Sequence, residues 1–260
     1  MSKYASDTIT VVNVNELADT IRLKSKNGEP SGIFYSFKNF TKEAFLLLLI
    51  LLGTPDLVID SITLYHVAIC GKVLDSAWAN KIAKALRRNK HVKTVDLGYN
   101  KIGDFGAQIF AKTFNQRFNP TIINLSLLGN YITIKGISAL TKVLETNKGL
   151  KTLDLSHNIF GVKGLEYLAG MLMVNKTITS LDAFDSTLKY DKDYIYVYNL
   201  LNYFLKTNQK IENRNLPLKQ NVITLLCAEQ MAALTPYLWA DILSLLETIR
   251  ADRATIDMES

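Results

Sequence analysis

Residues 92–102 read VKTVDLGYNKI, and residues 122–132 (IINLSLLGNYI) and 150–160 (LKTLDLSHNIF) align with them without a gap. All three segments place apolar residues at positions 1, 4, 6 and 11 and an asparagine at position 9, which gives the pattern L-x-x-L-x-L-x-x-N-x-L. Positions 4 and 6 alternate as in a short strand, and the amide at position 9 can hydrogen-bond backbone groups where the chain leaves that strand. We expect stacked copies to form a ladder of the amides Asn100, Asn130 and Asn158.

The segments between these copies have helical spacing. Residues 136–147 (GISALTKVLETN) carry Ile137, Leu140 and Leu144 on one face, and residues 164–175 (GLEYLAGMLMVN) repeat the arrangement. Each unit is therefore predicted to be a strand followed by a helix whose apolar stripe covers the strand layer. A single unit cannot bury both of its apolar faces, so the units must stack.

These segments resemble leucine-rich repeats. The copies start at residues 92, 122 and 150, so the repeats are 30 and 28 residues long, and this length is similar to that of the ribonuclease-inhibitor-like subclass. The resemblance implies an α/β solenoid. Its shape would be a curved horseshoe with a parallel sheet on the concave face, helices on the convex face, and helical caps.

Weaker copies extend the register on both sides, although they lack the asparagine. We expect about seven units, with starts near residues 30, 59, 92, 122, 150, 178 and 211. The predicted organisation is an N-terminal cap over residues 1–29, repeats over residues 30–219 and a C-terminal helical cap over residues 220–260. Within that last cap, residues 236–253 are predicted to form an amphipathic helix that seals the final repeat, and the alternative is a free helix that binds a partner.

Composition limits the class of protein. The 260 residues are 48% hydrophobic and carry a net charge of +6, which permits nucleic acid as a partner without demanding it. Cys70 and Cys227 each lie in an apolar run, which is typical of buried thiols in a reducing compartment. The longest apolar run, residues 45–52, is too short to cross a membrane, and no targeting segment is evident, so we expect a cytoplasmic protein.

Motifs for catalysis or cofactor binding are missing from the sequence. There is no HExxH, Cys-x-x-Cys, GxxxxGK[ST] or GxSxG pattern, and the glycines of residues 103–106 (GDFG) fit a strand-to-helix turn. The basic run over residues 81–93 is predicted to be a solvated convex helix, because no aromatic residues interleave it as in a base-stacking groove. We expect no catalytic residue, metal, cofactor or small-molecule substrate, and neither nucleic acid nor membrane as a partner.

The resemblance also implies which positions face outward on the concave sheet. These are positions 2, 3, 5, 7 and 8, and an aromatic or imidazole group occupies position 7 or 8 in five of six copies. Exposed aromatic groups are enriched at protein interfaces. The alternative is that Tyr and His merely tolerate exposure and that the outer copies are out of register. The predicted partner-binding residues are Phe34, Phe37, Tyr65, His66, Tyr99, Leu128, His157, Phe184 and Asp185.

Our leading hypothesis is a non-enzymatic module that binds a protein partner on its concave face and blocks the active site of a partner enzyme. Besides ribonuclease-inhibitor-like proteins, the chain looks like the short leucine-rich-repeat effectors of intracellular bacterial pathogens, some of which restrain a companion enzyme in the host cytosol. Two alternatives stay open: a GTPase-activating protein of the leucine-rich-repeat type, and a structural subunit of a larger assembly.

Overall fold

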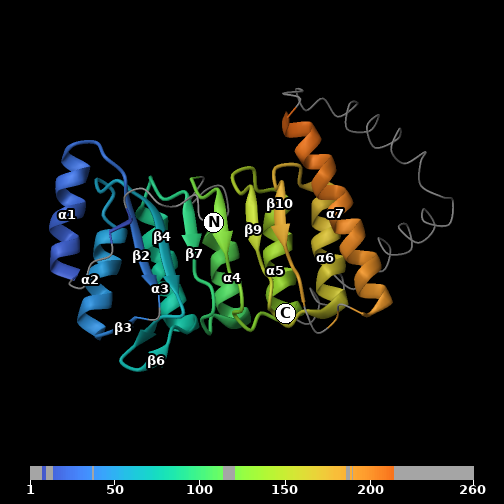
Figure 1. Ribbon diagram of the computed structural model, residues 1–260, viewed down its shortest axis with the longest axis horizontal. Coiled ribbons are helices and arrows are strands. Elements are labelled where there is room, and N and C mark those ends of the chain that lie inside the picture. Colours follow the sequence, from blue (N-terminus) through green and yellow to red (C-terminus); the bar gives the residue numbers. More distant parts are fainter. Residues whose placement is uncertain are drawn as a thin grey trace.

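The computed structural model describes residues 8–9, 14–36, 38–113, 121–185, 188 and 190–213. In these residues the strands lie side by side in one layer and the helices form a second layer behind them (Figure 1). The main sheet has seven strands, all paired in parallel, and its strand order follows the chain. The strands are β1 (Thr8–Ile9), β2 (Ser31–Ser36), β4 (Ile59–Tyr65), β7 (Thr94–Asp96), β8 (Asn124–Ser126), β9 (Thr152–Asp154) and β10 (Ser180–Asp182).

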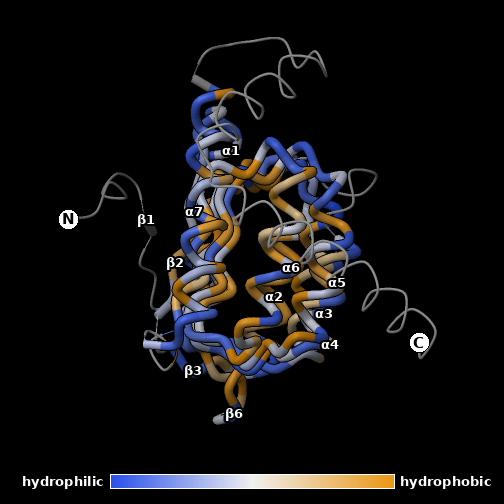
Figure 2. Tube along the Cα trace, turned by 90° about the vertical axis from the view of Figure 1, so that its right-hand side faces the viewer, coloured by the Kyte–Doolittle hydropathy of each residue, from blue (hydrophilic) through white to orange (hydrophobic). Residues whose placement is uncertain are grey.

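A helix follows each strand of the repeat and packs against the helix of the next unit. Figure 2, turned by 90°, places strand β2 on one side of the molecule and helices α3 to α6 on the other. The expected α/β leucine-rich-repeat architecture is confirmed by this arrangement. The helices are α1 (Val14–Lys26), α2 (Lys42–Leu52), α3 (Ser76–Arg88), α4 (Gly103–Thr113), α5 (Ile134–Leu144), α6 (Gly161–Val174) and α7 (Lys192–Asn213).

The core lies between the two layers and is built from the apolar repeat positions. In the central copies, positions 1, 4, 6 and 11 are buried, as Val92, Val95, Leu97 and Ile102 show with 0% exposure. From the other layer, the helices contribute the stripe predicted for them, including Leu140 of α5 at 0% exposure. Burial of these side chains supplies most of the driving force for stacking.

The asparagine ladder at position 9 is present and joins neighbouring units. Asn158 Oδ1 accepts hydrogen bonds from the backbone N–H groups of Asn130 and Ile132, both at 2.9 Å. Its amide Nδ2 donates to the carbonyls of Leu127 and Leu155 at 2.9 and 2.8 Å. Asn130 and Asn100 make equivalent contacts one and two units earlier. Each amide thus satisfies buried backbone groups that the strand ladder leaves without partners.

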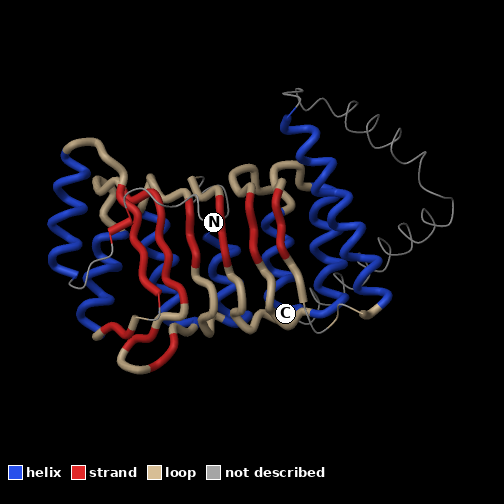
Figure 3. Tube along the Cα trace, in the orientation of Figure 1, coloured by secondary structure: helices blue, strands red, loops and turns tan. Residues whose placement is uncertain are grey.

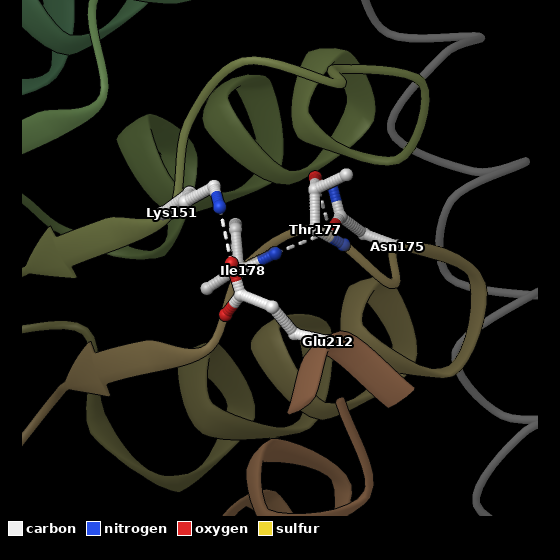
Figure 4. A network of polar contacts seen from close by, with 5 residues as sticks. All are labelled: Lys151, Asn175, Thr177, Ile178 and Glu212. Atoms are coloured by element: carbon white, nitrogen blue, oxygen red, sulfur yellow. Dashed lines mark hydrogen bonds and ion pairs between the residues drawn. The ribbon is translucent and has the colours of Figure 1, made fainter. Parts of the chain in front are cut away.

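A second row of asparagines, which the sequence analysis missed, lies where the helices end. Asn175 Oδ1 accepts from the N–H groups of Thr177 and Ile178 at 2.8 and 2.9 Å (Figure 4). Its Nδ2 reaches back to the carbonyl of Leu144 at 2.6 Å. Asn89 and Asn147 cap their own turns in the same way. All of them stand three residues before a copy start, so the signal was available in the sequence.

The unit that starts at residue 59 contains an additional hairpin. Strands β5 (Ala68–Ile69) and β6 (Lys72–Val73) pair antiparallel, and β3 (Asn39–Phe40) pairs with β5 to form a small second sheet below the ends of β2 and β4 (Figure 3). The hairpin accounts for the 33-residue spacing between the starts at 59 and 92. Cys70 lies in its turn with φ of 52° and is exposed, so the expectation that this thiol is buried is wrong.

The ends of the solenoid differ from the prediction. The expected seventh copy at Ile211 is wrong at its first residue, because Ile211 is helical and buried in the last turn of α7. Tyr194, Val197, Leu201 and Leu205 continue one buried stripe toward it, and this stripe holds the helix together beyond the length of its predecessors. At the other end, β1 adds a strand beside β2 in addition to the cap helix α1. Cys227 and the expected C-terminal cap at 220–260 lie outside the described residues.

Candidate protein-binding surface

The sheet has one face away from the helices, which we call the open face, and it corresponds to the concave face of the prediction. Position 5 of successive strands forms an in-register row across it: Phe34, Thr63, Asp96, Ser126, Asp154 and Asp182. Position 3 forms a parallel row of small polar residues, among them Thr94, Asn124 and Thr152. Because neighbouring strands are about 4.8 Å apart, side chains of one row can act together on a single ligand.

Aromatic and imidazole rings cross the carboxyl ends of the strands in a continuous row. The Tyr65 and Tyr99 rings have centroids 5.1 Å apart, and the Tyr99 and His157 rings have centroids 6.3 Å apart. The second contact spans the intervening unit, which has Gly129 at the equivalent position. We call Tyr65, Tyr99 and His157 the ring row.

Two glycines make the ring row geometrically feasible. A methyl group at Gly98 would lie 3.1 Å from two carbons of the Tyr65 ring, and one at Gly129 would lie 2.9 Å from Cδ1 of Tyr99. Each ring therefore lies over a glycine of the next unit. A side chain at either position would push the ring away from its neighbour.

Position 8 imposes a left-handed backbone on the residues it holds. The φ angles are 48° for His66, 54° for Tyr99, 62° for Gly129 and 55° for His157. The backbone N–H at this position donates to the position-7 carbonyl of the next unit, at 2.7 Å for Tyr99 to Leu128. A left-handed conformation costs a non-glycine residue about 1 kcal/mol or more. Tyr99 and His157 adopt this conformation although their side chains are exposed. Backbone strain of this kind clusters at functional sites.

The aspartates of position 5 have a structural role in each strand-end turn. Asp96, Asp154 and Asp182 accept a hydrogen bond from the N–H group two residues ahead, at 2.9, 2.9 and 3.1 Å. Burial raises the pKa of Asp96, the Asp154 carboxylate adds to that rise, and hydrogen bonds from the Gly98 N–H and the Ser126 side chain oppose it. The pKa of the Tyr65 hydroxyl is also raised, first by burial and then by Tyr99 and Asp96.

A second aromatic cluster lies at the C-terminal end of the sheet. Phe184 contacts Tyr198 at 6.5 Å between centroids, and Tyr198 stacks on Tyr194 at 5.6 Å. The Tyr194 hydroxyl accepts a hydrogen bond from the backbone N–H of Asp185 at 2.8 Å. The sequence analysis missed Tyr194 and Tyr198, because they belong to helix α7 and fall outside the strand pattern.

The structure brings some of the predicted binding residues together and separates others. Tyr65, Tyr99 and His157 form the ring row, whereas Phe184 and Asp185 belong to the second cluster. Beside the ring row, Leu128 is half-buried and His66 is exposed. Phe34 lies on β2 at the far end of the position-5 row and is exposed. Phe37 lies outside the described residues.

Two further searches were restricted to the described part of the chain. Within those residues, no group of three or more His, Cys, Asp and Glu side chains is arranged to hold a metal ion. A search of the same residues for a helix with the length and apolar character needed to cross a membrane finds none.

Comparison with known proteins agrees with the geometry. A family model described as "Leucine Rich repeat" matches residues 88–111 and 146–169. The chain contains leucine-rich repeats. Both matches begin near the end of one helix and run through the strand into the next helix, which is the unit that the structure repeats.

Two curated relatives and one solved structure are similar over part of the chain. The chain is 34% identical over 84 residues to "Ribonuclease inhibitor" of Sus scrofa, covering 32% of this chain and 18% of that protein. It is 31% identical over 109 residues to "NACHT, LRR and PYD domains-containing protein 9C" of Mus musculus, covering 40% of this chain and 10% of that protein. The structure of "Leiomodin-1 Actin-Binding Site 2 (ABS2)" aligns with a TM-score of 0.53 at 23% identity, over 64% of this chain and 92% of that one. That structural likeness supports the fold alone.

Proposed function

We propose that the chain is a non-enzymatic protein-binding module that contacts its partner through the open face, centred on the ring row. The observation that carries the proposal is the ring row itself: three rings at the strand ends, with the Tyr99 ring in contact with both others, and two of the three residues exposed in left-handed backbone conformations. Core packing does not explain this arrangement, since the rings lie on the face away from the helices. Exposed, preorganised aromatic groups are typical of interface hot spots.

The relatives are consistent with a binding role. One is named as an inhibitor of ribonuclease, and the aligned structure is named as an actin-binding site. By analogy with the inhibitor, the proposal extends to a partner enzyme whose active site is covered by the open face, as in an effector that restrains a companion enzyme. We place this activity in the cytosol of its own cell or of a host cell, where the exposed thiol of Cys70 would stay reduced.

Affinity capture with a matched control tests the proposal. The purified chain is immobilised and exposed to lysate of its own cells and of host cells, beside the triple variant Tyr65→Ala, Tyr99→Ala and Phe184→Ala. The control variant, Leu23→Ala, Ile50→Ala and Phe105→Ala, removes three apolar side chains of the helices that are 63%, 65% and 62% exposed. A partner retained by the wild type and the control but lost with the first variant supports the proposal. A partner that both variants retain moves the binding site off the open face.

A further inference from the structure

The open face is electrostatically polarised along the strands. Lys93 and Lys151 occupy position 2, where the chain enters the sheet, and Asp96 and Asp154 follow three residues later at position 5. Three residues of strand span about 10 Å. The cationic groups therefore lie at the strand beginnings, and the carboxylates lie at the strand ends beside the ring row. The amine of Lys151 is also engaged, since it pairs with Glu212 of α7 (Figure 4).

The carboxylates repel one another. Asp154 and Asp182 are register partners on adjacent parallel strands, and Asp154 also contributes to the raised pKa of Asp96. Like charges directly opposite each other destabilise a sheet. Among the ion pairs formed by the described residues, none involves Asp96, Asp154 or Asp182.

A carboxylate and an aromatic ring converge at one point of this face. A methyl group at Gly98 would lie 3.1 Å from the Tyr65 ring and 3.3 Å from Oδ1 of Asp96. That point is too crowded for a ligand, but it shows that the carboxylate and the ring are neighbours, and both side chains are partly exposed. A carboxylate beside an aromatic ring suits a planar cation lying over the pair, because a guanidinium can hydrogen-bond the carboxylate and stack on the ring. Lysine lacks that planar fork and fits the geometry less well.

We infer that the partner of the open face presents a segment bearing arginine side chains, which bind the carboxylates Asp96, Asp154 and Asp182 beside the ring row. This inference rests on the proposed function and specifies the chemistry of the partner. Asp96 and Asp154 stand on strands separated by β8, about 10 Å apart. Arginines at positions i and i+3 of a polyproline II segment, which has three residues per turn, lie on one side of it with nearly the same separation, about 9 Å.

The test uses a fluorescein-labelled peptide in which arginines alternate with pairs of prolines, which favour the polyproline II conformation, and the same peptide with citrulline in place of arginine. Citrulline keeps the shape and removes the charge. Binding to the full chain is measured by fluorescence anisotropy at low and high salt. We expect the arginine peptide to bind at least about tenfold more tightly than the citrulline peptide, with affinity falling as salt screens the carboxylates.

Two triple variants, each lacking three negative charges, distinguish the effect of the open-face carboxylates on peptide affinity from the effect of the net charge of the chain. Asp96→Asn, Asp154→Asn and Asp182→Asn keep an oxygen that can accept the turn hydrogen bond, and circular dichroism checks that they fold. Asp19→Asn, Glu43→Gln and Asp193→Asn remove the same charge from exposed positions on the helices. We expect about a tenfold loss of peptide affinity for the first variant and no loss for the second. Equal affinities for both peptides, or equal losses in both variants, would overturn the inference.

Capture experiments distinguish a failure of this inference from a failure of the proposed function. If the triple aspartate variant still captures the cellular partner while the Tyr65→Ala, Tyr99→Ala and Phe184→Ala variant loses it, the open face binds a protein but the inference of an arginine-bearing partner is wrong. If neither variant affects capture, the open face itself is not the binding site.

Discussion

At the scale of single residues, conformational cost explains which side chains the solenoid tolerates at each repeat position. Asn fills position 9 because its amide both donates and accepts, as the contacts of Asn158 show. Position 8 demands a left-handed backbone, for which glycine or asparagine is the usual choice. Tyr99 and His157 stand there instead, so local stability does not explain their presence.

A glycine comparison tests whether the ring row depends on open space at Gly129. Gly129→Ala and Gly161→Ala place the same methyl group on backbones with φ of 62° and 64°, but only the first meets a ring, at 2.9 Å from Tyr99. We expect Gly161→Ala to lose about 1 kcal/mol of unfolding free energy from its backbone alone. Gly129→Ala should lose more and should also shift the NMR resonances of the His157 ring. Equal losses with an unchanged His157 spectrum would mean that Tyr99 does not lie over Gly129.

The raised pKa of Asp96 predicts a pH dependence of stability. Because burial and Asp154 raise this pKa on folding, the native state binds the proton more tightly than the unfolded chain. Ionising Asp96 therefore costs stability as the pH rises from the ordinary value of 3.8 through the pKa of the folded protein. We expect Asp96→Asn to gain unfolding free energy relative to the wild type across that interval. Urea denaturation over a pH series measures it, and a difference independent of pH would contradict the shift.

At the scale of elements, hydrogen bonds between units lock one helix to the next. Asp104, in the first turn of α4, accepts from the N–H groups of Thr133 and Gly136 at 2.7 and 3.0 Å and from the Thr133 hydroxyl at 2.7 Å. It thus caps the N-terminus of α5 across the unit boundary. The negative charge also suits the helix dipole there.

A double-mutant cycle measures this inter-unit cap. Asp104→Ala should cost about 2 kcal/mol of unfolding free energy, because it leaves N–H groups at the start of α5 without a partner. Thr133→Ala alone should cost about 1 kcal/mol. The double variant should lose less than the sum, since the two side chains share one hydrogen bond. Strict additivity in chemical denaturation would show that the cap is not shared between the units.

Much of the element pattern was predictable from the sequence, because the repeat is periodic. The strands β7, β8 and β9 and the helices after them follow directly from the positions of apolar residues in three gapless copies. The weaker copies at 30, 59 and 178 also form strands, since their positions 4 and 6 stay apolar. At the expected start at 211, Ile211 instead continues the buried stripe of α7, and the strand positions of that copy lie outside the described residues.

The candidate site was predictable only in part. The outward-facing repeat positions identified Tyr65, Tyr99 and His157. They do not show that the Tyr99 and His157 rings meet across the intervening unit, or that the Tyr65 and Tyr99 rings lie over Gly98 and Gly129. Tyr194 and Tyr198 reach Phe184 from a helix, so no strand register points to them. The charge polarity of the open face required knowing which aspartates lie in register on adjacent strands.

At the scale of the whole molecule, the architecture separates stability from binding. The buried layer between sheet and helices holds the repeat residues, while the open face carries the ring row and the carboxylates at one edge of the sheet. Substitutions at the strand ends of the open face should therefore change the affinity for the proposed partner with little effect on unfolding, apart from the aspartates that accept turn hydrogen bonds and the positions with a left-handed backbone. Repeat proteins use such extended faces to bind partners.

Site-specific photocrosslinking tests the central claim most directly. A benzoylphenylalanine replaces Tyr99 in the ring row in one variant and Phe105 of α4, which is 62% exposed, in another. Both replace an exposed aromatic residue, so the variants differ mainly in the surface they sample. The account predicts that, on irradiation in cell lysate, the probe at Tyr99 forms a covalent adduct with one defined protein and the probe at Phe105 does not. An adduct from Phe105 alone, or the same adduct from both positions, would contradict binding through the open face.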